Sequence, residues 1–105
     1  MSALDLIITK EINERIEKIK PEFSKYIIED SFDYVPYETG KLANSAHIDE
    51  NGNIIYDEPY AQEVYDSDRQ YDTDKHKQAT GHWVERAYKD KADKWKQKLK
   101  DLILK

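Results

Sequence analysis

The sequence predicts an α+β fold, in which two long helices at the ends of the chain flank a small antiparallel sheet. Apolar residues recur every three or four positions over residues 3–33 and again over residues 82–104, which is the spacing of one helix face. Between these segments, Asn51-Gly52 stands among alternating apolar residues and predicts a β-hairpin. A length of 105 residues suits one domain, and we expect residues 1–105 to form it.

Composition predicts a folded protein with a thin core. Leu, Ile, Val and Phe account for 22 of the 105 residues, just above the roughly 20% below which chains tend to remain disordered. Charged residues make up 37% of the chain, so we expect neighbouring copies to supply part of its stability. There is no cysteine, which excludes disulfides and thiolate metal sites. Apolar runs such as residues 6–8 are far shorter than the ~20 residues of a membrane span, so we expect synthesis in a cytoplasm and no membrane partner.

The charges are unevenly distributed along the chain. Residues 49–74 contain nine acidic side chains and one basic side chain, whereas residues 82–105 contain eight basic and four acidic side chains. The net charge of −5 argues against general affinity for nucleic acid, because such binding depends on Lys and Arg against phosphate. The opposite signs of the two segments suit contact between neighbouring copies, and two solvated faces are the alternative.

Residues 3–33 are predicted to form the first helix. Pro21 lacks an N–H, and its ring presses on the carbonyl of Glu17, so the helix should kink or break near Lys20. The helix should end before Pro36, since the residue before a proline is displaced from the α region. One apolar stripe runs along it, made of Leu4, Ile8, Ile12, Ile16, Ile19, Phe23 and Ile27.

A turn and a strand are predicted next. Thr39-Gly40 turns the chain, because glycine supplies backbone freedom there. Residues 42–49 then alternate well enough for a strand, with Ala46 and Ile48 on one face.

The hairpin turn and the returning strand follow. Asn51-Gly52 predicts a two-residue type I′ turn, since both residues accept positive φ. Residues 53–57 are the returning strand, with Ile54 and Tyr56 on one face and the intervening residue on the other.

A short helix and a long loop are predicted to lead to the last helix. Pro59 suits the first position of a helix over residues 60–65, in which Tyr60 packs against Val64. Residues 66–81 have no periodicity and no aliphatic side chain larger than alanine. A loop of this length is either mobile or functional.

Residues 82–104 are predicted to form the second long helix. Six lysines between residues 89 and 100 line one side of it, and we interpret them as a solvated face whose stems shield the apolar side. The aromatic residues Tyr88 and Trp95 lie on the apolar stripe, which favours burial over base stacking. That stripe comprises Val84, Tyr88, Ala92, Trp95, Leu99 and Leu102, widened by Trp83, Ala87 and Ile103.

The residues do not predict an enzyme. His76 and His82, with Asp72 and Asp74 nearby, form the best candidate for a metal site, but their spacing in an irregular loop does not match a rigid zinc site. His47 falls in a predicted strand among small residues, where an exposed or satisfied histidine is the simpler interpretation. We therefore expect no catalytic residue, no metal and no cofactor.

Four short motifs follow one another along the chain: V-P-x-x-T-G-x-L-x-x-S, I-x-Y, P-Y-A and H-W-x-x-R-A. We expect their residues, with the turn residues, to serve as scaffold, and Tyr56, Tyr60 and Trp83 to be large anchors in the core or at an interface. The set comprises Val35, Pro36, Thr39, Gly40, Leu42, Ser45, Asn51, Gly52, Ile54, Tyr56, Pro59, Tyr60, Ala61, Trp83, Arg86 and Ala87.

This order of motifs resembles the minor capsid or tail-completion proteins of tailed bacteriophages. The resemblance implies a virion protein of the neck that assembles with itself into a ring at the head–tail junction. Its implied partners are the connector or stopper and the tail-terminator or tail-tube proteins, with double-stranded DNA as passing cargo. The long loop would then contact the next ring or line the channel, through Asp66, Asp68, Arg69, Tyr71, Asp72, Asp74, Lys75 and His76.

Two other functions are compatible with single features of the sequence. The acidic segment 49–74 could occupy a basic surface of a host protein, as a DNA mimic does. A metal-dependent hydrolase would use His76 and His82, and we do not expect it. Among the rings of the neck, the resemblance leaves completion, stopper and terminator rings open.

Overall fold

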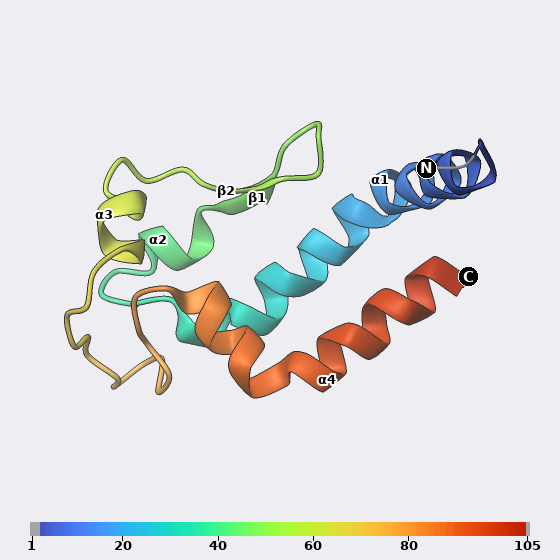
Figure 1. The fold of residues 1–105 in the computed structure, drawn as a ribbon. Helices are drawn as coiled ribbons and strands as arrows, with labels where there is room; N and C mark the ends of the chain where they lie inside the picture. The colour runs from blue at the N-terminus through green and yellow to red at the C-terminus, as the bar shows by residue number, and fades with distance from the viewer. Residues whose placement is uncertain (1–2, 105) are drawn as a thin grey trace.

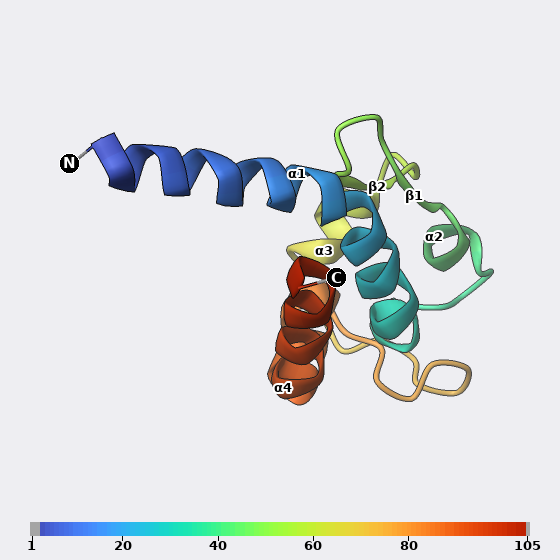
Figure 2. The same ribbon diagram turned by 90° about the vertical axis from the view of Figure 1, so that its right-hand side faces the viewer.

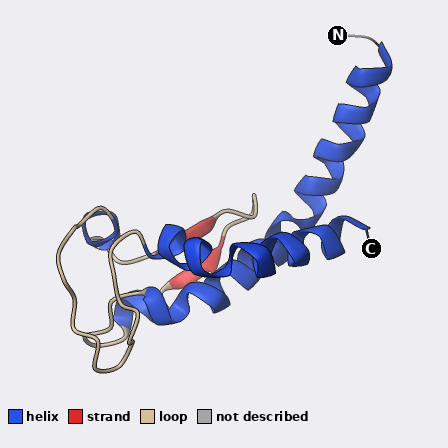
Figure 3. Ribbon diagram, turned by 60° about the horizontal axis from the view of Figure 1, so that its bottom comes forward, coloured by secondary structure: helices blue, strands red, loops and turns tan. Residues whose placement is uncertain are grey.

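The computed structural model of the chain describes residues 3–104, with side chains described for Ala3 and from Thr9 onward. Two long helices run antiparallel, because the N-terminal end of one and the C-terminal end of the other lie on the same side of the molecule (Figure 1). A two-stranded antiparallel sheet lies beside the long helices, and short helices lie at the end of the molecule away from the two termini (Figure 3). This arrangement confirms the predicted α+β class. The elements are α1 (Ala3–Ser31), η1 (Phe32–Tyr34), α2 (Lys41–Asn44), β1 (Ala46–Ile48), β2 (Ile54–Tyr56), α3 (Ala61–Tyr65) and α4 (Trp83–Leu104).

Helix α1 continues through its proline. It is one helix of 29 residues with Pro21 inside it, so the chain bends here and does not break. Figure 2 shows the axis of α1 changing direction near the region that the colour bar assigns to residue 20, and the first half projecting away from the rest. The helix ends at Ser31, two residues earlier than predicted, because a turn of 3₁₀ helix, η1, replaces its last residues.

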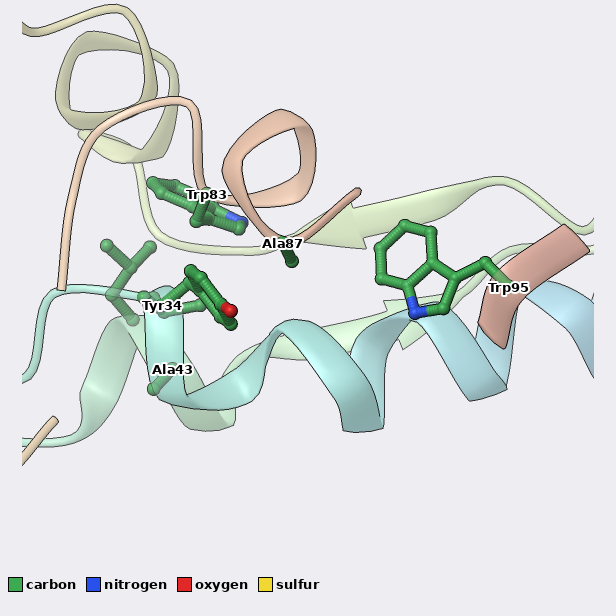
Figure 4. Close-up of a cluster of buried hydrophobic side chains, with 7 residues drawn as sticks. Tyr34, Ala43, Trp83, Ala87 and Trp95 are labelled. Atoms are coloured by element: carbon green, nitrogen blue, oxygen red, sulfur yellow. The ribbon is translucent and has the colours of Figure 1, made fainter. Parts of the chain in front are cut away.

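The core lies where the end of α1, the segment after it and the start of α4 meet (Figure 4). Trp83 is 1% exposed and Val35 is fully buried. The small side chain of Ala87 lets α4 approach the rest of the core closely. The full cluster comprises Tyr34, Val35, Leu42, Ala43, Trp83, Ala87 and Trp95.

Residues 42–44 belong to helix α2 (Lys41–Asn44), so the prediction of a strand beginning at residue 42 is wrong. Gly40 caps the helix with a φ of 85°, and the Asn44 side chain donates a hydrogen bond of 2.8 Å to the Gly40 carbonyl. Leu42 and Ala43 are both buried although they are adjacent in sequence, which a helical turn against the core allows and a half-exposed strand does not. The strand begins at Ala46, and the predicted faces of both strands are confirmed by their burial.

The hairpin is confirmed, but its turn is not type I′. Gly52 has a φ of 81°, whereas Asn51 does not adopt positive φ. The Gly52 amide donates to the carbonyl of Asp49, and the loop closes with the amide of Asp49 on the carbonyl of Asn53. Hydrogen bonds from the backbone N–H groups of Asn53 and Asn51 stabilise the Asp49 carboxylate and lower its pKa. The hydrogen bonds of the Asp49 side chain therefore stabilise a loop longer than two residues, in which Gly52 has the left-handed conformation.

The remaining elements begin slightly later than predicted. Pro59 lies in a turn before α3, which starts at Ala61. Helix α4 starts at Trp83, because His82 has a left-handed φ of 49°. Lys91 departs from helical geometry inside α4. Tyr88 is 43% exposed, and its predicted burial is wrong. Within residues 3–104, no helix combines the length and apolar character needed to cross a bilayer.

Candidate functional site

The residues 66–81, named here the acidic loop, form one end of the molecule beside α2 and α3 (Figure 1). Its two ends are held together. The His82 amide donates a hydrogen bond of 2.7 Å to the Tyr65 carbonyl. Gly81 lies so close to this region that a Cβ atom at that position would be 2.1 Å from the Ser67 carbonyl oxygen. The loop is therefore a closed lobe with a fixed base.

The middle of the acidic loop is anchored in the body of the protein by His76. This side chain is 6% exposed, and its Nδ1 atom lies 2.8 Å from the Val35 carbonyl oxygen. The rings of Phe32 and Tyr37 lie 4.7 Å and 4.5 Å from the imidazole, centroid to centroid. The Thr80 amide adds a hydrogen bond of 2.9 Å to the Tyr34 carbonyl. These contacts give the loop a defined shape.

The acidic side chains of the loop point to solvent. Asp66, Asp68, Asp72 and Asp74 are all exposed, and within the described part of the chain none of them forms a salt bridge. Two carry local hydrogen bonds: Asp72 accepts from the Asp74 amide at 2.9 Å, and Asp66 accepts from the Gln62 side chain at 2.8 Å. The result is a concentration of negative charge on a shaped surface.

Basic and aromatic residues accompany the acids. The Arg69 guanidinium lies 5.2 Å from the centroid of the Tyr71 ring, and the Lys75 ammonium lies 5.4 Å from that of Tyr37. Arg69 and Tyr71 border a hollow of about 510 Å³, which separates the acidic loop from the turn before α2. Its other walls include Pro36, Thr39, Gly40, Leu42, Glu58 and Tyr60. Several motif residues thus meet the loop at one surface.

The motif residues divide into a buried set and a surface set. Val35, Leu42, Trp83 and Ala87 are core residues, and Pro36, Gly40 and Gly52 are also buried. Ser45, Ile54, Tyr56 and Ala61 are partly buried, whereas Thr39, Asn51, Pro59, Tyr60 and Arg86 are exposed. The buried members are part of the core or lie against it, and the scaffold role of the whole set stays a prediction.

The large aromatic residues of the motifs behave differently from one another. Tyr56 packs edge-on against Trp83 with ring centroids 5.2 Å apart, and its burial raises its pKa. The indole N–H of Trp83 is buried without a hydrogen-bond partner among the described residues. Tyr60 is 42% exposed at the surface hollow, so it contributes little to the core.

The seam between α1 and α4 contains a polar cluster that the sequence did not predict. Asp30 accepts hydrogen bonds from the Trp95 indole N–H at 2.7 Å and from Lys94 at 3.3 Å, and its carbonyl accepts from Lys91 at 2.9 Å. The hydrogen bond and charge of Asp30 raise the pKa of Lys94. The sequence feature that could have indicated this cluster is the position of Asp30, which lies three residues after Ile27 and therefore on the apolar face of α1.

The lysines of α4 are only partly a solvated row. Besides Lys91 and Lys94, which bond to α1, Lys98 lies 5.4 Å from the centroid of the Tyr26 ring. These contacts bind α4 to α1 and use charges that would otherwise be available to a ligand. The remaining lysines of the row, Lys89, Lys96 and Lys100, are exposed.

The candidate metal ligands are not brought together. His76 lies among Phe32 and Tyr37, whereas the His82 ring packs against Tyr65 at 5.3 Å between centroids. Across the residues whose side chains are described, no group of three or more His, Cys, Asp or Glu residues has an arrangement that could hold a metal ion.

Comparison with known proteins complements this geometry. A family model described as "Minor capsid protein" matches residues 5–101 of the 105 residues. No curated protein and no solved structure matches the chain. The family match covers α1 from its third residue, the hairpin, the acidic loop and nearly all of α4. The chain therefore belongs to a minor capsid protein family of bacteriophages, whose role is structural.

Proposed function

We propose that this chain is a subunit of an oligomeric ring in the phage neck, where the ring joins the DNA-filled head to the tail and lets DNA pass. Its partners in this role are other copies of itself, the connector or stopper on one side, and the tail-terminator or tail-tube protein on the other. The family match supports a virion component. The location in the neck and the assembly into a ring are what we propose beyond the family match.

The observation that carries this proposal is the anchored acidic loop. His76 is buried in this loop and its Nδ1 atom lies 2.8 Å from the Val35 carbonyl oxygen, so the loop has a fixed shape. The contacts of His76 hold four exposed aspartates on a preformed surface at one end of an elongated molecule, whose extents are 53 × 27 × 24 Å. A preformed surface binds with less loss of conformational entropy than a mobile loop.

The acidic surface also suits the passage of DNA. Carboxylates facing phosphates repel DNA, whereas a lining of lysine or arginine would bind it. In a ring that places Asp66, Asp68, Asp72 and Asp74 toward its axis, the genome would therefore move with little adhesion. A structure of the assembled ring with these four side chains on its outer rim would contradict the channel part of the proposal.

The test of the neck role is mass spectrometry of purified particles, followed by electron microscopy of particles made without this protein. We expect a few copies per virion, and full heads beside unattached tails when the protein is missing. A chain absent from the virion would overturn the proposal. A single host protein recovered in stoichiometric amount with such a chain would instead favour the DNA-mimic function.

A further inference from the structure

The first half of α1 exposes apolar side chains. It projects beyond the hairpin and α4 (Figure 2), and residues 9–19 of this half are named here the arm. Ile12 is 49% exposed and Ile16 is 39% exposed. Both isoleucines line a small hollow of about 200 Å³ together with Ile103 of α4, and they remain partly exposed there. Glu11 and Arg15 flank the two isoleucines in this hollow and are also exposed.

A groove with apolar walls lies elsewhere on the molecule, between the second half of α1 and α4. Its volume is about 640 Å³, and its walls include Phe23, Ile27, Tyr88 and Leu99. Tyr88 is 43% exposed although it lies on the predicted apolar stripe. The rim of the groove carries the charged residues Glu85, Lys89 and Lys96.

The charges beside the arm and the groove are complementary in only one of the two orientations that the arm could take along α4. On the arm, Glu11 and Arg15 are four residues apart, and on the groove rim Glu85 and Lys89 are also four residues apart. Both pairs therefore lie about one helical turn apart on their own helix. If the arm lies antiparallel to α4, Glu11 faces Lys89 and Arg15 faces Glu85. In the parallel orientation, like charges face each other at both positions, which is unfavourable.

We propose that the arm of one copy binds in the groove of the next copy, antiparallel to α4, with Ile12 and Ile16 against the apolar walls. This inference rests on the proposed function, since it names the contact that would build the ring.

The contact joins two different surfaces, the arm of one copy and the groove of another. Because the second half of α1 and α4 are antiparallel within one chain (Figure 1), the bound arm runs parallel to the second half of α1 in the copy that receives it. The ring of the proposed function requires this contact to be head-to-tail, with each copy giving its arm to the groove of the next. Repeated head-to-tail contacts close into a ring when the rotation between copies allows it.

Disulfide cross-linking tests the contact directly, because the natural chain has no cysteine. Chains carrying Ile16→Cys are mixed with chains carrying Tyr88→Cys, oxidised, and separated on a non-reducing gel. We expect a mixed dimer at least about tenfold more abundant than with the control Lys18→Cys, which lies on the opposite side of the arm. Equal yields from the two arm positions, or a dominant Ile16→Cys homodimer, would overturn the proposal.

Charge reversal tests the orientation. Adding Glu11→Lys with Arg15→Glu to the arm variant should lower the mixed cross-link by about tenfold. Adding Glu85→Lys with Lys89→Glu to the other chain should then restore it. The matched control reverses Glu14 and Lys18, a pair with the same spacing on the opposite side of the arm, and should leave the yield unchanged. Failure of the second reversal to restore the cross-link would contradict the antiparallel arrangement.

The same oxidation of intact particles separates this inference from the proposed function. In particles whose chain carries both Ile16→Cys and Tyr88→Cys, we expect a ladder of linked copies. A chain present in the virion that gives no ladder and no mixed dimer in solution would overturn the arm contact and leave the neck role standing. A chain that forms the mixed dimer and is absent from the virion would support the arm contact and overturn the neck role.

Discussion

Asp30 is a single residue that connects the two long helices. Its side chain has 14% relative exposure and accepts hydrogen bonds from Trp95 and Lys94. The bond from the Trp95 indole is the more important for stability, because Trp95 is 3% exposed and its N–H has no access to bulk water as a replacement partner. Lys94 is exposed and contributes less.

Replacement of Asp30 by alanine should therefore destabilise the protein by about 2–3 kcal/mol, since it leaves the buried indole N–H without an acceptor. Asp30→Asn keeps an acceptor and should cost about half as much. Urea unfolding of the purified variants measures the difference. The neighbouring exposed residue provides the control, because Glu29→Gln should change the free energy of unfolding by less than about 0.5 kcal/mol. A loss of that small size in Asp30→Ala would contradict the role assigned to the carboxylate.

Gly81 contributes to stability because the backbone around it leaves no space for a side chain. A Cβ atom there would meet the Ser67 carbonyl at 2.1 Å, and a backbone atom cannot move aside as a flexible side chain can. Gly81→Ala should therefore destabilise the protein by about 1–3 kcal/mol and increase proteolysis within the acidic loop. Limited proteolysis with mass detection measures this. Gln78→Ala, at an exposed position in the same loop, should leave the cleavage rate unchanged.

At the scale of elements, the hairpin is held by a contact between its turn and α1. Ser24 of α1 is 8% exposed and donates a hydrogen bond of 2.7 Å to the Gly52 carbonyl. The same glycine approaches Pro21, whose ring nitrogen would lie 3.2 Å from a Cβ atom at position 52. The proline inside α1 and the glycine in the turn therefore contribute to one docking contact.

Ser24→Ala should loosen this contact by about 1 kcal/mol, because the Gly52 carbonyl loses its buried donor. Hydrogen exchange observed by NMR should show the Asp49 amide, which bonds to the Asn53 carbonyl, exchanging roughly fivefold faster. The exposed residue beside it supplies the control, Lys25→Ala, for which we expect no change. Unchanged exchange in Ser24→Ala would show that the turn is stable without α1.

The segment η1 is joined to α4 by a hydrogen bond that depends on pH. The Tyr34 hydroxyl donates to Asp90 at 2.7 Å, and burial together with this bond raises the pKa of Tyr34 to about 12. The ordinary value for tyrosine is about 10. Only the protonated phenol can donate, so its contribution to stability is complete below pH ~10 and is lost as the pH rises toward 12.

Tyr34→Phe should remove the part of the alkaline loss of stability that arises between pH 10 and 12, and should lower stability at pH 7 by about 1 kcal/mol. The free energy of unfolding measured against pH tests this prediction. Tyr60→Phe, at a 42% exposed position, should keep the profile of the natural protein. If the free energy of unfolding of Tyr34→Phe fell between pH 10 and 12 with the same slope as that of the natural protein, the pH-dependent bond would not belong to Tyr34.

At the scale of the whole molecule, the acidic loop at one end of an elongated shape differs in charge from α4, which runs along the molecule (Figure 1). The acidic loop has four exposed aspartates, whereas much of the positive charge lies on α4 and part of it is bound to α1. The surface that would meet a channel or another ring is therefore chemically distinct from the surfaces that hold the molecule together. Changes in one should leave the other intact.

Replacement of Asp66, Asp68, Asp72 and Asp74 by asparagine tests this separation. The net charge changes from −5 to −1, and the free energy of unfolding should stay within about 0.5 kcal/mol because all four side chains are exposed. Particles carrying this chain should release DNA more slowly in a dye-based ejection assay. Serine substitutions of Thr73 and Gln78 in the same loop form the control. Normal ejection would contradict the proposed role of the acids in DNA passage.

Local patterns in the chain were sufficient for the two long helices, the hairpin, the alternation of its faces and the resemblance that the family match then confirmed. These features depend on residues that are neighbours in sequence, so periodicity and turn composition report them directly. Packing across the chain decided the rest. His76 meets Val35 over a separation of 41 residues and Asp30 meets Trp95 over 65, and no local pattern encodes such pairs. The helical turn at α2 and the exposure of Tyr88 likewise follow from how distant segments cover one another, because burial depends on what lies opposite a residue.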